Sequence, residues 1–452
     1  MTPRRASKLI HRFSLLALAA GALGCGGDGG SGPTFTFAWD WVGVVGTGQS
    51  LSVGANGTPY LATQQPYGNL KLGFGGATVA PPFDPNIASL EMLPLTEPIR
   101  PADPLYPSAY PGNLDGETPH AAMANQLTAM VMQEASHDYV TVHAVVGESG
   151  QPMTVIKKNP TNLPADGTSG RAYDATLFEA AAINRLAGAA GKSYGIGAIV
   201  ITHGESDAGN SVYANDLYQL LTDYNTDLAA ITGQTAKIPM FASQQNSVPS
   251  DTGAVAVSAL QVWKASKDHP GEVVCTGPKY QYTYASDAVH LNAKEYERLG
   301  EKTAQIYFER MVAGNDWQPL QPTSGEVSAN TVTVHFHVPV PPLVLDDTLP
   351  APHGTMIPDW AMGRGFEVSR GGLRQTITAV EIVGGDAVKI TCANELAGAE
   401  VIVGYANTAE GVTPPSGMTA RWGHLRDSDP FVGAVTQTPQ PNYAIAFQMA
   451  VP

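Results

Sequence analysis

The chain has few cysteines and few charged side chains. Three cysteines occur among 452 residues, and charged residues make up only 14%. So few cysteines exclude a scaffold held together by disulfides. The short His and Cys spacings that are typical of zinc sites are also missing. We therefore expect no catalytic metal and no cofactor.

Basic side chains are scarcer than acidic ones. The chain has 25 Lys and Arg residues against 40 Asp and Glu residues, which gives a net charge of −15. A surface this acidic repels nucleic-acid phosphates and anionic lipid headgroups. We therefore expect no nucleic-acid partner, and a neutral or weakly charged small-molecule or glycan substrate fits better.

The N-terminus has the pattern of an export signal. Four basic residues precede an apolar run over 13–23, which is too short to span a bilayer comfortably. Gly24-Cys25 and a Gly/Ser-rich stretch follow. We expect 1–25 to be a signal peptide of the lipoprotein type, with Cys25 as lipid anchor and sole membrane contact. The alternative is a plain signal with a free cysteine. Either way the protein is exported, to the outer membrane or cell surface, or else to the periplasm or medium.

Residues 38–313, after a Gly/Ser-rich linker at 26–37, alternate apolar strand segments with helical segments. The strands are expected at 42–45, 139–146, 196–201, 238–242 and 272–275. The helices are expected at 119–135, 173–190, 212–232, 252–266 and 293–311. This alternation predicts a three-layer α/β/α domain with a parallel sheet. The stretch 50–118 is irregular, and we expect it to frame a substrate cleft.

The pattern changes after a linker predicted at 314–330. Apolar and polar residues alternate strictly over 331–338, which predicts a half-buried strand. Further short strand segments follow, so we expect 331–452 to form an antiparallel β-sandwich. His335 and His337 would lie on the solvated face of a strand. Cys275 and Cys392 fall in different predicted domains, and we expect both to be buried and unpaired.

Three polar clusters follow predicted strand ends, where ligands bind in parallel sheets. Ser50 ends a glycine-rich turn after the first strand, and glycines allow the tight backbone that exposes a nucleophile. Asp287 precedes His290 by three residues, so its carboxylate can orient the imidazole. The third cluster, at 203–208, can supply oxyanion donors or orient a substrate. Each cluster alone is only weak evidence for an active site.

Together, the order of these clusters resembles the SGNH hydrolases, most closely the carbohydrate esterases that are similar to sialate O-acetylesterase. The resemblance rests on Gly48-Gln49-Ser50, on the cluster that begins at His203, and on Asp287-x-x-His290. It implies an acyl-serine mechanism on short acyl esters of carbohydrate, with Ser50 as nucleophile, His290 as base and Asp287 orienting it.

The resemblance also implies an oxyanion hole and substrate contacts. The hole would combine three donors: the backbone N–H of Ser50, a glycine backbone N–H and the side chain of His203. The glycine would be Gly150, with Gly147 as the less favoured choice. Gln49 and Glu205 would contact substrate.

Two residues depart from the family pattern: Leu51 stands where Asn is usual, and His203 where Gln is usual. Two rival nucleophiles fit less well. Ser149 misses the G-x-S-x-G spacing, and Ser206 lies between two acids that disfavour an alkoxide. Two other functions stay open: a glycan-binding surface lipoprotein on a degenerate hydrolase scaffold, and an acyltransferase that uses the same triad.

Overall fold

The computed structural model describes residues 35, 37–75, 83–100, 116–159, 169–247, 255–354, 356–409 and 414–452. The predicted signal peptide, the Cys25 anchor and most of the first linker lie outside the described residues. Phe35–Pro452 constitute one compact unit. Both predicted domains therefore belong to the same unit.

The centre of the first region is a seven-stranded sheet in the order β3-β2-β4-β1-β5-β6-β7. Only the edge strand β3 is antiparallel to its neighbour. Along the chain, the strands β1, β4, β5, β6 and β7 follow the spatial order 2-1-3-4-5, so the connections reverse direction between β1 and β5. The strands are β1 (Trp41–Gly48), β2 (Leu70–Gly73), β3 (Glu91–Pro94), β4 (Val140–Gly147), β5 (Tyr194–Thr202), β6 (Met240–Gln244) and β7 (Val273–Pro278).

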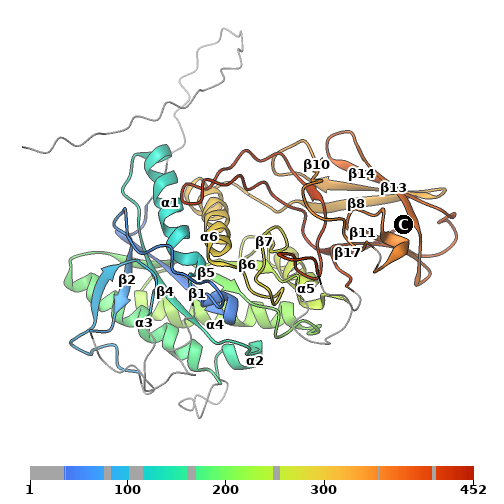
Figure 1. Ribbon diagram of the computed structural model, residues 1–452. Helices are drawn as coiled ribbons and strands as arrows, with labels where there is room; N and C mark the ends of the chain where they lie inside the picture. Colours follow the sequence, from blue (N-terminus) through green and yellow to red (C-terminus); the bar gives the residue numbers. More distant parts are fainter. Residues whose placement is uncertain are drawn as a thin grey trace, which may run out of the picture. The chain divides into compact units, whose positions relative to one another are not determined.

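Helices cover both faces of this sheet, as Figure 1 shows. One face carries α1 (Pro119–Ala135) and α6 (Ala293–Tyr307), and α6 continues as a π-helical turn, Phe308–Val312. The other carries α3 (Arg171–Ala189), α4 (Tyr213–Thr232) and α5 (Val257–Asp268), and the short α2 (Met153–Ile156) precedes α3. The predicted three-layer domain is confirmed.

Alternation along the buried strands builds the two hydrophobic layers. Val44 of β1 packs in a cluster with residues of α1 and α6. Its neighbour Val45 belongs to the cluster that includes α3, α4 and α5, because successive strand side chains point to opposite faces. Both layers are apolar, which is why these strands read as continuous apolar runs in the sequence.

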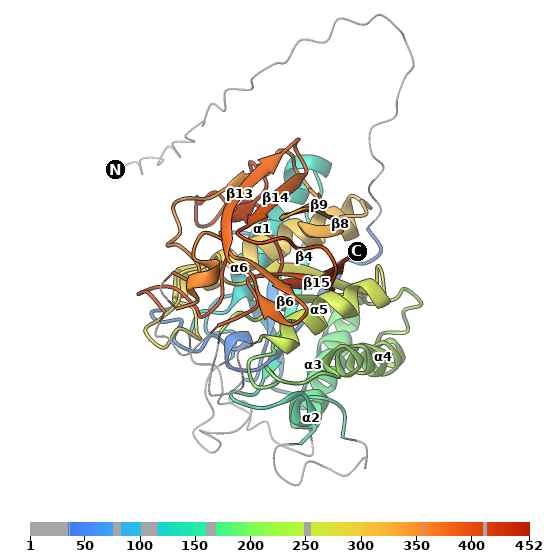
Figure 2. The ribbon, with the colours of Figure 1, turned by 90° about the vertical axis from the view of Figure 1, so that its right-hand side faces the viewer.

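Two four-stranded antiparallel sheets form the C-terminal region, in the orders β12-β11-β15-β17 and β13-β14-β9-β8 (Figure 2). The predicted sandwich is confirmed. The linker predicted at 314–330 is wrong in part, because β8 lies within it and pairs with β9. The strands are β8 (Gln321–Ser328), β9 (Thr331–His337), β11 (Phe366–Arg370), β12 (Leu373–Arg374), β13 (Ile377–Val383), β14 (Ala387–Cys392), β15 (Val401–Tyr405) and β17 (Phe447–Val451), with a separate pair β10 (Val344–Leu345) and β16 (Leu425–Arg426).

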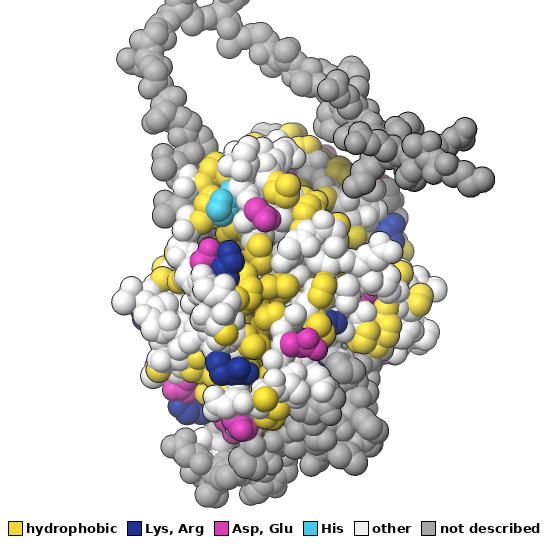
Figure 3. Space-filling model, turned by 90° about the vertical axis from the view of Figure 1, so that its left-hand side faces the viewer, with side chains coloured by type: hydrophobic (Ala, Val, Ile, Leu, Met, Phe, Trp, Pro, Cys, Tyr) yellow, Lys and Arg dark blue, Asp and Glu magenta, His cyan; other side chains and the backbone are white. Residues whose placement is uncertain are grey.

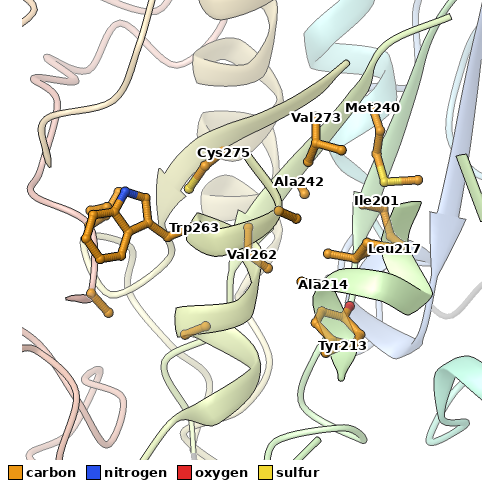
Figure 4. Packing of buried hydrophobic residues seen from close by; sticks show 14 of the residues in the cluster. Ile201, Tyr213, Ala214, Leu217, Met240, Ala242, Val262, Trp263, Val273 and Cys275 are labelled. Carbon is orange, nitrogen blue, oxygen red and sulfur yellow. The ribbon is translucent and has the colours of Figure 1, made fainter. Parts of the chain in front are cut away.

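The two cysteines of the described chain are buried and unpaired, as predicted. Cys275 lies in the core beside Val262 and Trp263 of α5 (Figure 4), and burial raises the pKa of its thiol to about 12. Charged side chains are scattered on the face drawn in Figure 3, in keeping with the low charged fraction. Among the described helices, none combines the length and apolar character needed to cross a bilayer.

Candidate active site

The carboxyl ends of β1, β4 and β5 meet at the point where the strand order reverses. In register, Gly48 at the end of β1 faces Gly147 of β4 on one side and Thr202 of β5 on the other. The loops that follow these strands begin with Gln49, Glu148 and His203. Open α/β sheets bind their ligands at this crevice. The sheet therefore brings the Ser50 cluster and the cluster at 203–208 to one edge.

A tight turn carries Ser50 out of β1. Gly48 has a φ of 137°, and a Cβ there would overlap the carbonyl oxygen of Thr202, so only glycine fits. The next backbone N–H, of Gln49, donates to that same carbonyl at 3.2 Å. Ser50 then starts a short 3-10 helix, Ser50–Ser52, in which the Ser52 hydroxyl donates to the Gln49 carbonyl at 2.6 Å. The turn is fixed on both sides of Ser50.

Ser50, His290 and Asp287 form one chain of hydrogen bonds. The Ser50 Oγ lies 2.7 Å from His290 Nε2, and His290 Nδ1 lies 2.7 Å from Asp287 Oδ2. The other carboxylate oxygen of Asp287 accepts the backbone N–H groups of Val289, at 3.0 Å, and of His290, at 2.9 Å. The carboxylate therefore fixes the turn that carries the imidazole and orients the ring.

The charge of Asp287 defines the direction of both hydrogen bonds that link Asp287, His290 and Ser50. Partial burial raises the pKa of Asp287, but the hydrogen bonds from the backbone and ring of His290 and from Val289 outweigh it and hold the pKa below its usual value. An ionised Asp287 accepts the proton on Nδ1, so Nε2 is left to accept the hydroxyl proton of Ser50. This tautomer makes His290 able to act as a base toward Ser50.

A residue that the sequence reasoning missed, Asn56, completes this arrangement. Its side-chain amide donates to Asp287 Oδ2 at 2.8 Å, across 231 positions of sequence. Asn56 has a φ of 62°, in the left-handed region that Asn tolerates better than most residues. The only signal in the sequence is the Asn56-Gly57 pair, a common turn dipeptide. Nothing in the sequence indicates that Asp287 is the partner of Asn56.

Leu51, one of the departures from the family pattern, has a packing role. Leu51 follows Ser50, Leu291 follows His290, and both are fully buried in one cluster. The cluster also contains Tyr282, Tyr284, Tyr296 and Leu299. Since a close-packed core holds its side chains in fixed positions, the two leucines hold the Ser50 and His290 turns against each other.

His203 does not lie as the resemblance implied. Its Nε2 lies 3.0 Å from the carbonyl oxygen of Gln151, and its Nδ1 lies 2.8 Å from the hydroxyl of Tyr213. A carbonyl only accepts, so Nε2 carries the proton and Nδ1 accepts from Tyr213. The ring is fully buried, and burial lowers its pKa. With both nitrogens committed, the oxyanion role expected for His203 is wrong for this arrangement.

The two predicted substrate contacts are also occupied within the fold. Glu205 is buried and pairs through Oε1 with Lys279 Nζ at 2.7 Å. The side-chain oxygen of Gln49 accepts the backbone N–H of Ser206 at 3.0 Å. Glu205 therefore does not face a substrate, and Gln49 joins the Ser50 turn to the loop after β5. The pairing with Lys279 argues against the contact expected for Glu205, whereas the contact expected for Gln49 stays a prediction.

The loop after β4 holds the other predicted oxyanion residues. Gly147 is buried, whereas Gly150 lies on an exposed turn with a φ of 72°. Between them, Glu148 is held by two hydrogen bonds from Arg171, at 2.7 and 2.8 Å. The oxyanion roles of Gly150 and of the Ser50 backbone stay predictions.

A segment of the C-terminal region packs against the turn that carries His290. The hydroxyl of Thr419 donates to the carbonyl of Ala288 at 3.2 Å, and the backbone N–H of Tyr284 donates to Gly417 at 2.9 Å. The buried Arg421 anchors this segment by donating to the Ser247 carbonyl at 2.7 Å. The C-terminal region therefore braces the Asp287–His290 turn directly.

No group of three or more His, Cys, Asp or Glu side chains in the described ranges is arranged to hold a metal ion. His335 and His337 lie half-buried on β9, one residue apart on the same face.

Comparison with known proteins supports the fold. No protein-family model and no curated protein matches the chain. It is similar to the crystal structure of a carbohydrate acetylesterase from Xanthomonas citri, with a TM-score of 0.52 and 11% identity, covering 90% of this chain and 80% of that one. A protein from Arabidopsis thaliana (17% identity, 60% and 98% covered, TM-score 0.41) and NanS (12%, 60% and 97%, 0.39) also match, at TM-scores too low to carry an argument.

Proposed function

We propose that this protein is a serine esterase of the SGNH type that hydrolyses short acyl esters, above all acetyl esters on carbohydrate. The observation that carries the proposal is the continuous chain of hydrogen bonds from Ser50 through His290 to Asp287. The similar fold of a carbohydrate acetylesterase supports the substrate class.

The reaction would proceed in two halves. In the first, Ser50 Oγ bonds to the ester carbonyl carbon as His290 Nε2 takes the hydroxyl proton, and the ionised Asp287 stabilises the resulting imidazolium. The ester C–O bond then breaks, and Nε2 gives its proton to the departing alcohol oxygen. An acyl-serine remains.

In the second half, water replaces the alcohol. His290 takes a proton from water, whose oxygen attacks the acyl carbon, and Ser50 Oγ leaves and recovers the proton from Nε2. The carboxylic acid is released. In both halves, the backbone N–H groups of Ser50 and Gly150 are the expected donors to the tetrahedral oxyanion.

Ser50→Ala tests this assignment. We expect hydrolysis of p-nitrophenyl acetate and acetate release from acetylated xylan to fall about 10⁴-fold or more, because the acyl-serine cannot form. The circular dichroism spectrum and melting temperature should stay those of the unmodified protein. Equal rates in both proteins would overturn the nucleophile.

The same assay separates the alternatives. A glycan-binding protein on a degenerate scaffold would show no turnover in either form, and the intact hydrogen-bond chain argues against it. An acyltransferase would form an acylated product with an added sugar acceptor in preference to free acetate. Product analysis by mass spectrometry measures that ratio.

Export and lipidation remain part of the proposal. We infer from the sequence that the N-terminal segment is a lipoprotein signal and that Cys25 carries the lipid anchor. Radioactive palmitate supplied to the native host should label the wild-type protein. It should not label the Cys25→Ser variant. Labelling that persists in Cys25→Ser would refute the anchor.

A further inference from the structure

The structure contains a cavity of about 420 Å³. None of the three hydrogen-bonded residues Ser50, His290 and Asp287 lines it. Four parts of the chain build its walls: the segment 61–67, helix α1, helix α6 and the C-terminal residues 434–435. Its volume falls in the range of small-molecule sites. The cavity therefore has the size and the convergent walls of a binding site.

Buried carboxylates hold two of these walls in place. Glu117 Oε2 accepts the backbone N–H of Leu61 at 2.6 Å and of Ala62 at 3.2 Å. On the opposite wall, Glu301 Oε1 accepts the backbone N–H of Val435 at 2.6 Å. Hydrogen bonds to a carboxylate are among the stronger ones in proteins. The walls are thus preformed.

Two polar side chains face the cavity with hydrogen-bonding capacity to spare. Asn125 and Glu297 line it, and each is only 7% exposed. Among the described residues, Asn125 Oδ1 has no hydrogen-bond partner. A buried acceptor left without a partner destabilises the folded state, because it has lost its hydrogen bonds to water. A ligand hydroxyl placed there would remove that destabilisation.

Glu297 can both donate and accept near neutral pH. Burial, and then the neighbouring carboxylates of Glu117 and Glu301, raise its pKa to about 7. A protonated carboxyl carries one O–H donor and still accepts. This pairing of donor and acceptor suits hydroxyl groups, which themselves do both.

The rest of the lining is mostly apolar, and Thr63 and Gln64 are its further polar residues. Leu61, Pro66, Tyr67 and Val435 contribute apolar surface, and none of the described lining residues is basic. An anion would therefore meet the Glu297 carboxyl group with no basic residue in the lining itself. A sugar ring presents C–H faces for such a surface and hydroxyls for Asn125 and Glu297, and tyrosine suits such amphipathic ligands.

We propose that this cavity is a binding site for a neutral saccharide, separate from the Ser50 site. The site would hold a glycan on the protein independently of ester cleavage. The proposal goes beyond the proposed function and does not depend on it.

Binding measured in the Ser50→Ala background tests the site apart from turnover. The probes are xylobiose, cellobiose and chitobiose as neutral disaccharides, digalacturonate as an anion and choline as a cation, followed by isothermal titration calorimetry and saturation-transfer NMR. We expect at least one neutral disaccharide to bind, and digalacturonate and choline to bind more weakly.

Variants locate the binding. Tyr67→Ala removes stacking surface, and Asn125→Leu removes the unpartnered acceptor, so each should weaken the disaccharide about 3- to 10-fold. Tyr218→Ala is the matched control, because Tyr218 is also a half-buried tyrosine but lies on α4, away from the cavity. It should leave affinity unchanged.

Three outcomes would overturn the proposal. They are no binding by any of the three neutral disaccharides, binding that Tyr67→Ala and Asn125→Leu leave intact, and binding of choline in preference to sugar. Because Tyr67 is partly exposed, its variant should keep the melting temperature. The test therefore stands even if Asn125→Leu impairs folding. Failure of esterase activity would not affect any of these readouts.

Discussion

The loop after β5 and the turn before α6 each carry a histidine and a carboxylate a few residues apart, yet the fold uses them differently. His203 is fully buried and commits both ring nitrogens to Gln151 and Tyr213. His290 keeps 20% of its side chain exposed and turns Nε2 toward Ser50. Similar residue types at similar spacing therefore differ in whether the surrounding fold buries their polar atoms with internal partners or leaves them partly exposed.

The largest effect should come from the reactive turn. Asp287→Asn would present an amide to His290 Nδ1 and favour the tautomer that cannot take the Ser50 proton. We expect kcat for p-nitrophenyl acetate to fall about 10³- to 10⁴-fold, with the melting temperature nearly unchanged. A variant that keeps full activity would remove Asp287 from the mechanism.

The buried loop should respond in stability. Lys279→Met leaves the Glu205 carboxylate buried without its partner, so the free energy of unfolding should fall by about 3–5 kcal/mol. Urea denaturation measures it. The matched double variant, Glu205→Leu with Lys279→Met, should recover most of the loss. If the single variant kept its stability and lost activity, the pair would belong to the reactive site after all.

His203→Ala sharpens the comparison directly. It leaves a buried carbonyl and the Tyr213 hydroxyl without partners, so we expect a loss of about 1–3 kcal/mol in unfolding free energy. The kcat of the folded protein should change less than about threefold. A loss of 10²-fold or more in kcat at unchanged stability is what removal of an oxyanion donor produces, and it would restore that role.

The smallest effect should come from Asn56. Asn56→Gly suits the φ of 62° but removes the hydrogen bond to Asp287. We expect kcat to fall about 3- to 10-fold, the equivalent of one ordinary hydrogen bond. Asn56→Ala should lose the same activity and an additional 1–2 kcal/mol or so of stability, because alanine is strained in the left-handed region. An unchanged kcat in Asn56→Gly would leave Asn56 with no part in orienting Asp287.

Local patterns in the sequence predicted most of the strands and helices around the central sheet, and they singled out Ser50, Asp287 and His290, which lie in hydrogen-bond contact. The apolar runs predicted the strands β1, β4, β5, β6 and β7. Strict alternation predicted β9. The strand β8 was missed, because Pro322 and Gly325 interrupt its pattern and its partner strand supplies the order.

Long-range partners explain the remaining errors. The sequence shows Glu205 only as a carboxylate in a loop. Its ion-pair partner, Lys279, lies on another segment of the chain. Asn56 carried no signal beyond a turn. Hydrogen bonds across many positions of sequence leave no local periodicity, so propensity and spacing cannot reveal them.

By itself, the sequence determined the layers of this protein and the order of its polar clusters, because the periodicity of apolar residues follows from which faces must be buried. Only the tertiary structure decided which of those clusters faces solvent. Leu51 and Leu291 share the buried cluster that holds the Ser50 and His290 turns together, and the C-terminal segment at Thr419 braces the His290 turn. Burial commits the His203 and Glu205 side chains to partners inside the fold, because a buried polar group without such partners would destabilise it.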